Sequence, residues 1–158
     1  MQVQEITMSY APALVGGRKT PPPVSARPSA TSPDLAHAVF RAIWADDMDI
    51  CERIYALYCD QRLRVLGYAC LSQGGVSSTS LDMKLLFQKA VSLRQPAGRL
   101  FIAHNHPSGN IRPSDSDYTL TRKVSNAAKL LDIQLLDHLI LVPDGQFTSI
   151  QNLDATCF

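Results

Sequence analysis

The segment "FIAHNHPSGNIRPSDSD", residues 101–117, contains the residue types and the spacing most able to do chemistry. Residues i and i+2 of a strand point to the same face, so His104 and His106, at the end of an apolar run, can direct both imidazoles at one point. Asp117 follows a turn rich in proline and glycine and can be brought back to the same place. Two histidines and one carboxylate are typical of catalytic zinc, because the fourth position stays open for water.

A purely structural interpretation of the same residues stays open. Ser114 and Asp117 match the capping-box pattern, in which a serine begins a helix and an acidic residue lies in its first turn. A His-x-His pair alone also occurs in many proteins that bind no metal. Both histidines, however, lie where an apolar strand ends beside Pro107 and a glycine-containing loop, which is where sites are usually built. The two interpretations are compatible, since one turn can cap a helix and deliver Asp117 to an ion.

The composition indicates one globular domain. The chain has 158 residues, of which 46% are hydrophobic and 18% charged. A net charge of +1 gives no electrostatic footprint of a nucleic-acid-binding protein, so direct DNA or RNA binding is not expected as the main activity. The sequence contains no apolar run long enough to cross a membrane and no secretion signal pattern, and its four cysteines form no Cys-x-x-Cys pair. We therefore expect a cytoplasmic protein with reduced, mostly buried thiols.

The sequence divides into an extension and a folded domain. Residues 1–31 are rich in Pro, Gly, Ser and Thr and predict a flexible extension, whereas residues 32–158 predict one domain. Ser32 is a candidate N-cap, followed by an apolar stripe at helical spacing that includes Leu35, Val39 and Phe40. Later segments predict a hairpin (53–60 and 63–71), a loop or irregular strand (72–80), a helix after Asp82, a strand (98–106), a helix (about 114–131), a strand (133–142), a tight turn (143–145) and its antiparallel partner (146–150). The order αββαβαββ is that of a mixed α/β or α+β layered domain.

The motif resembles the JAMM (MPN+) metalloprotease signature, which is His-x-His, seven residues, then Ser-x-x-Asp. "HNHPSG", "LLDHLIL" and "CERIYALYCDQRLRVLG" are similar to the RadC-like branch of that family, known from DNA repair protein RadC, and the likeness covers roughly residues 33–152. The resemblance implies a JAB/MPN-like (cytidine-deaminase-like) fold, a mixed sheet flanked by helices. It also implies one zinc ion held by His104, His106 and Asp117, with Ser114 stabilising an oxyanion.

The resemblance further implies a general base, because JAMM peptidases use a glutamate at the start of an upstream strand. Glu52 matches that place and is the only glutamate of the folded part. The alternative is an ordinary solvated carboxylate at a strand entrance. Other candidates are poorer: Asp60 and Asp82 suit turn and cap positions, Gln73 cannot take a proton, and Cys70 is better explained by packing.

Two further positions have open roles. Asp137 either orients a ligand histidine or belongs, with His138, to a polar pair satisfied by the backbone. RadC-like relatives usually carry an Arg-Glu pair just before Val-Phe, whereas this chain has Lys84 and Leu85 there, so the acidic residue is missing.

Two functions follow. The first is a zinc-dependent hydrolase that acts on a peptide or isopeptide-like amide of a peptide or protein substrate. The alternative is a catalytically weak or inactive accessory module in DNA metabolism, with zinc structural or absent.

Overall fold

A five-stranded mixed sheet forms the centre of the computed structural model, which describes residues 26–44, 46–73, 81–93 and 95–158. The strand order is β2-β1-β3-β4-β5, and only β3 and β4 are parallel. The elements are α1 (Pro33–Ile43), β1 (Arg53–Cys59), β2 (Val65–Gln73), α2 (Met83–Ser92), β3 (Arg99–Asn105), α3 (Asp115–Lys129), β4 (Gln134–Leu141), β5 (Phe147–Ser149), α4 (Ile150–Leu153) and a 3-10 helix (Ala155–Cys157). The predicted α/β class and the order αββαβαββ are confirmed, with two short C-terminal helices added.

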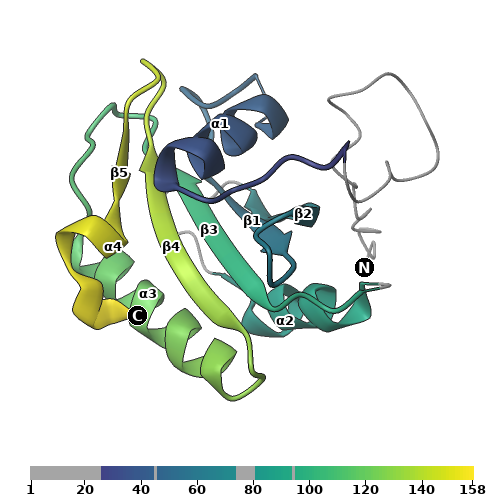
Figure 1. Ribbon diagram of the computed structural model, residues 1–158. Coiled ribbons are helices and arrows are strands. Elements are labelled where there is room, and N and C mark those ends of the chain that lie inside the picture. Colours follow the sequence, from purple (N-terminus) through teal and green to yellow (C-terminus); the bar gives the residue numbers. More distant parts are fainter. Residues whose placement is uncertain (1–25, 45, 74–80, 94) are drawn as a thin grey trace, which may run out of the picture.

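Helices cover both faces of the sheet, which gives three layers (Figure 1). On one face α2 and α3 bury Leu86 and Val124 against strand residues such as Ile102. On the other face α1 buries Phe40 against strand residues such as Leu139. β1 and β3 are buried on both faces, because alternate side chains of each strand enter the two cores.

The predicted stripe of α1 is correct in part. Val39 and Phe40 are buried, but Leu35 is 45% exposed and the fully buried Ala36 takes its place. The sheet contacts the row formed by positions 36, 39, 40 and 43, so Leu35 lies at the edge of that row. Ser32 caps the helix as predicted, because its hydroxyl accepts from the Leu35 N–H.

Most of the predicted flexible extension, residues 1–25, lies outside the described residues, as do residues 74–80 of the predicted loop. The last part of the extension contacts the domain: Ser29 forms a β-bridge with Arg64, and Ala30 is fully buried. All four cysteines are free thiols; Cys59 and Cys157 are buried, and Cys51 and Cys70 are half-buried. Within the described ranges no helix is long and apolar enough to cross a membrane.

The connection from β3 through α3 to β4 decides where a site forms. β3 pairs with β1 on one side and β4 on the other, so its carboxyl end lies inside the sheet. α3 begins after the loop that leaves β3 and therefore starts beside that end. Ligands of α/β folds bind at the carboxyl ends of parallel strands for this reason.

Candidate metal centre

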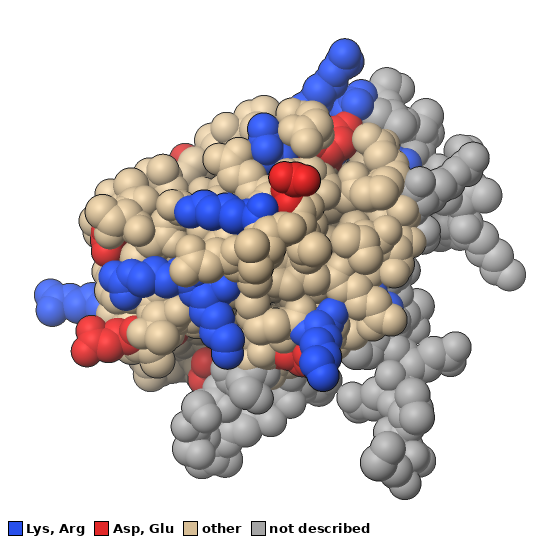
Figure 2. Space-filling model, turned by 90° about the horizontal axis from the view of Figure 1, so that it is seen from below, with Lys and Arg blue, Asp and Glu red and all other residues tan. Residues whose placement is uncertain are grey.

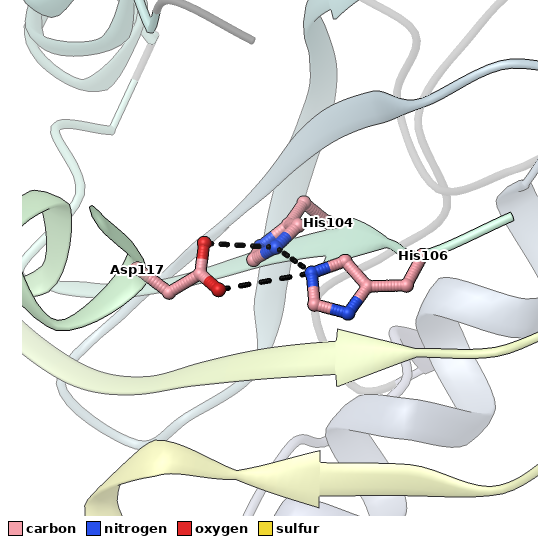
Figure 3. A group of neighbouring side chains, drawn as sticks. All are labelled: His104, His106 and Asp117. Atoms are coloured by element: carbon pink, nitrogen blue, oxygen red, sulfur yellow. Dashed lines mark hydrogen bonds and ion pairs between the residues drawn. The ribbon is translucent and has the colours of Figure 1, made fainter. Parts of the chain in front are cut away.

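Three side chains meet at the carboxyl end of β3 (Figure 3). His104 belongs to β3, His106 follows it, and Asp117 lies in the first turn of α3. The two Nε2 atoms are 2.9 Å apart, and Asp117 Oδ1 lies 3.1 Å from His104 Nε2. Asp117 Oδ2 lies 3.7 Å from His106 Nε2. Among the described residues, this is the group of His, Cys, Asp or Glu side chains able to hold a metal ion.

The loop between β3 and α3 returns the chain to the strand end. The His106 N–H donates to the Leu141 carbonyl, which continues the parallel pairing one residue beyond β3. Gly109 has a φ of 77°, a left-handed conformation that favours glycine, and its N–H donates to the His106 carbonyl to close a turn. Thr148 of β5 then fixes the loop by donating its hydroxyl hydrogen to the Ile111 carbonyl.

Asp117 is held by the predicted capping box, which the structure contains in full. Its Oδ2 accepts from both the backbone N–H and the hydroxyl of Ser114, each at 2.7 Å, so Oδ1 is the oxygen left to face His104. Burial by itself raises the pKa of Asp117, but interaction with His104 and the Ser114 hydrogen bonds hold that pKa well below its usual range. The carboxylate is therefore ionised at neutral pH and suited to a cation.

His106 is oriented by the loop itself. Its Nδ1 lies 2.6 Å from the Asn110 carbonyl oxygen, and a carbonyl can only accept, so Nδ1 carries the proton. Nε2 then offers a lone pair toward His104 and Asp117. The His106 side chain is 18% exposed whereas that of His104 is 3% exposed, so the group opens to solvent on the His106 side.

His104 has two buried polar groups behind it. Its Nδ1 lies 2.8 Å from Nε2 of His138, and His138 Nδ1 lies 2.7 Å from the Thr121 hydroxyl. Thr121 in turn donates to the backbone carbonyl of Asp117 at 2.7 Å. Sequence reasoning missed Thr121, although its place four residues after Asp117 puts both on one face of a helix.

Asp137 follows the backbone interpretation and does not orient a ligand histidine. Its carboxylate accepts from the His138 and Gln151 N–H groups and from the Ser149 hydroxyl. It pairs with Phe101 in the register and so faces the α1 side of the sheet. His138 faces the opposite side and is the residue that contacts His104.

Glu52 is not part of the three-residue group and lies half-buried just before β1. β1 pairs with β3 so that Ile54 is opposite His104, and continuing that register by two residues puts Glu52 opposite His106. Residues opposite each other in an antiparallel pair project to the same face. Asn105 fixes this segment, because its buried side chain accepts from the Arg53 N–H at 2.8 Å and donates to the carbonyls of Met48 (2.6 Å) and Cys51 (2.8 Å).

The poorer candidates have structural roles. Asp60 is buried and accepts from the N–H groups of Arg62 and Arg64, and Asp82 caps α2 through the N–H groups of Lys84 and Leu85. The side chain of Gln73 lies outside the described part. Leu85, where the resemblance led us to expect an acidic residue, is half-buried and packs against the core beneath α2.

Comparison with known proteins identifies relatives. The family described as "RadC-like JAB domain" matches residues 30–155. A UPF0758 protein of Porphyromonas gingivalis is 45% identical over 98 residues, which are 62% of this chain and 42% of that protein. A UPF0758 protein of Thermosynechococcus vestitus is 40% identical over 124 residues, 77% of this chain and 47% of that protein. The chain thus spans less than half the length of these relatives.

Proposed function

The chain belongs to the RadC-like JAB domain family, and we propose that it is a zinc-dependent hydrolase that cleaves a peptide or isopeptide-like amide bond. The observation that carries the proposal is the convergence of His104, His106 and the free oxygen of Asp117 at the end of β3. Electron-pair donors this close are stabilised by a shared cation. The partial exposure of His106 gives solvent access to this group.

The donor set suits zinc in chemistry and in size. Imidazole nitrogen and carboxylate oxygen bind zinc at about 2.0–2.1 Å, so the edge of a tetrahedral site measures about 3.3 Å. The observed separations are 2.9 Å between the Nε2 atoms, 3.1 Å from His104 Nε2 to Asp117 Oδ1 and 3.7 Å from His106 Nε2 to Asp117 Oδ2, values that lie on both sides of that edge. Zinc held there supplies Lewis acidity, which lowers the pKa of a coordinated water toward neutrality.

Glu52 is the proposed general base. The register supports this role when it is continued two residues beyond the Ile54–His104 pair, because a carboxylate on the same face as both histidines can accept a proton from a water between them. Asn105 supports it too, since its three hydrogen bonds restrain the segment that carries Glu52. After cleavage the same carboxyl group would return the proton to the leaving amine.

Ser114 is the proposed donor to the developing oxyanion. Its hydroxyl is exposed at the start of α3 and donates to Asp117 Oδ2 in this structure. The Ser114 N–H donates to the same oxygen, so the hydroxyl can turn to a substrate carbonyl while Oδ2 keeps a partner. A preorganised donor of this kind contributes a factor of roughly 10²–10³ to the rate.

The test separates binding of the metal from the chemistry. Protein purified without added zinc is expected to carry one zinc per chain by elemental analysis, and Asp117→Asn is expected to lose it. Asp115→Asn, an exposed acid in the same helical turn, is the matched control and should keep it. Wild-type protein without stoichiometric metal would rule the proposal out.

Glu52→Gln tests the chemistry. This variant should keep its zinc but hydrolyse internally quenched peptides and a lysine-linked isopeptide about 10²–10⁴-fold more slowly, the usual contribution of a general base. Asp49→Asn, an exposed acid in the preceding loop, is the control. Equal rates for Glu52→Gln and wild type would remove Glu52 from the mechanism.

A second candidate is an accessory module in DNA metabolism, which Leu85 and the exposed cations of α3 favour. Arg122, Lys123 and Lys129 are exposed on that helix. Figure 2 shows Lys and Arg side chains spread over one face, with Asp and Glu side chains and uncharged surface among them. Phosphate binding by such a face should weaken steeply with salt, so affinity for a DNA duplex that is flat from low to moderate salt would count against phosphate contacts by this candidate.

A further inference from the structure

His138 and Thr121 form a chain of hydrogen bonds that begins at His104 and ends at the backbone of Asp117, two residues of the metal group. It runs from the His104 ring to His138, then to the Thr121 hydroxyl, and finally to the backbone carbonyl of Asp117. His138 and Thr121 are both fully buried, His138 in β4 and Thr121 in α3. The chain therefore connects three elements whose relative positions also set the distance between two of the ligands.

The proton directions in this chain follow from its last member. The Asp117 carbonyl oxygen can only accept, so the single hydroxyl hydrogen of Thr121 must lie on the 2.7 Å line between them. Thr121 Oγ1 is then an acceptor for His138, and the proton of that ring lies on Nδ1. A neutral imidazole has one donor and one acceptor, so His138 Nε2 accepts and His104 Nδ1 donates.

The opposite direction is disfavoured. If Thr121 donated to His138, its oxygen would face the Asp117 carbonyl oxygen at 2.7 Å with no hydrogen between them. His138 would then donate to His104, and the proton of His104 would lie on Nε2, the atom that faces Asp117 and His106. That tautomer has no lone pair to offer a metal ion.

We propose that Thr121 and His138 are positioning residues that keep the proton of His104 on Nδ1 and its lone pair on Nε2, and that they thereby raise the affinity of the site for zinc. The inference rests on the metal-binding part of the proposed function and not on the hydrolysis. A hydrogen-bond partner on the second nitrogen orients ligand histidines in general, and its loss usually lowers metal affinity 10–100-fold. His106 obtains the same orientation from a backbone carbonyl, so only His104 depends on replaceable side chains.

Thr121→Val tests the chain, because valine keeps the shape of threonine and removes the hydroxyl. Zinc affinity, measured by competition with a chromophoric chelator, is expected to fall 10–100-fold, and Thr121→Ser is expected to restore it. Thr119→Val is the matched control: Thr119 lies in the same helix and donates in the same way to the Asp115 carbonyl, but it is exposed. The zinc affinity of Thr119→Val should equal that of wild type, since of these two threonines only Thr121 contacts His138.

The tautomer can be observed directly by long-range ¹H–¹⁵N correlation spectra of the histidine rings in metal-free protein. In the wild type we expect a protonated Nδ1 on His104 and on His138, and in Thr121→Val a mixture of His138 tautomers, because His138 Nδ1 loses its acceptor. A wild-type His138 protonated on Nε2, or equal zinc affinity in Thr121→Val and wild type, would overturn the inference.

The outcomes separate the two proposals. If wild-type protein binds no zinc, the metal site is ruled out and with it the effect on affinity. If zinc affinity does not depend on Thr121, only the proposed role of the hydrogen bonds through Thr121 and His138 is ruled out. If Thr121→Val does not fold, the wild-type tautomer spectrum of His138 still decides the question.

Discussion

Asn105 is expected to contribute more to stability than any surface contact, although it binds no metal. It lies between the two histidines, is fully buried, and makes three hydrogen bonds to the backbone of residues 48–53. Each such bond contributes about 1 kcal/mol net, and each buried group left without a partner costs about 1–3 kcal/mol. Asn105→Ala should therefore lower the free energy of unfolding by about 3–5 kcal/mol. At about 2–4 °C per kcal/mol for a chain of this size, the melting temperature should fall by about 10 °C.

The side-chain chemistry of Asn105 can be separated from its volume. Asn105→Asp keeps the acceptor for the Arg53 N–H but replaces the two donated hydrogens with an oxygen that faces the carbonyls of Met48 and Cys51. It should destabilise the fold at least as much as alanine at neutral pH, because a buried carboxylate would face two carbonyl oxygens.

The assay is urea unfolding followed by circular dichroism, with Asn126→Ala on the exposed face of α3 as control. The control should change the free energy of unfolding by less than about 0.5 kcal/mol. In partly unfolded Asn105 variants, the Arg53 amide should exchange with solvent faster than amides at the centre of β3. A loss below about 1 kcal/mol in Asn105→Ala would refute the view that this side chain holds the Glu52 segment in place.

Three other outcomes follow from single residues. Burial by itself raises the pKa of Asp60, but hydrogen bonds from Arg64 and Arg62 hold it below the ordinary value. Because the pKa of Asp60 is lower in the folded than in the unfolded protein, the ionised carboxylate stabilises the fold above pH ~4, and this stabilisation is lost as the pH falls through the folded-state pKa. Asp60→Asn should therefore lower the free energy of unfolding by about 1–3 kcal/mol in thermal melts at pH 7 and by progressively less in acid. Burial, with the Asp60 charge, raises the pKa of Cys59 to about 12, so iodoacetamide at pH 8 should modify this thiol only after unfolding, as read by mass spectrometry. Gly109→Ala should lower the free energy of unfolding in urea by about 1 kcal/mol, because alanine is strained at this positive φ, and it should also weaken zinc binding. Gly145→Ala, at a φ of 92°, is the control, which should lose as much stability but leave zinc binding unchanged.

The sequence by itself determined the local parts of this protein. Alternation along a strand put His104 and His106 on one face, and the Ser114–Asp117 spacing specified a capping box that the structure contains. The hairpin of β1 and β2 and the tight turn before β5 followed from turn residues and strand periodicity. These features depend on residues within a few positions of one another, so the geometry of a helix or strand is enough to predict them.

Only the tertiary structure decided which residues surround the metal group, because the contacts involved join residues far apart in the sequence. His138 contacts His104 only because β4 pairs with β3 in the observed register, and Thr121 reaches His138 only because α3 packs on that face. The same register turned Asp137 away from the metal group, and helix packing left Leu35 exposed while it buried Ala36. A shift of one residue in β4 would exchange the two faces, so no local pattern distinguishes His138 from Asp137 as the partner of a ligand.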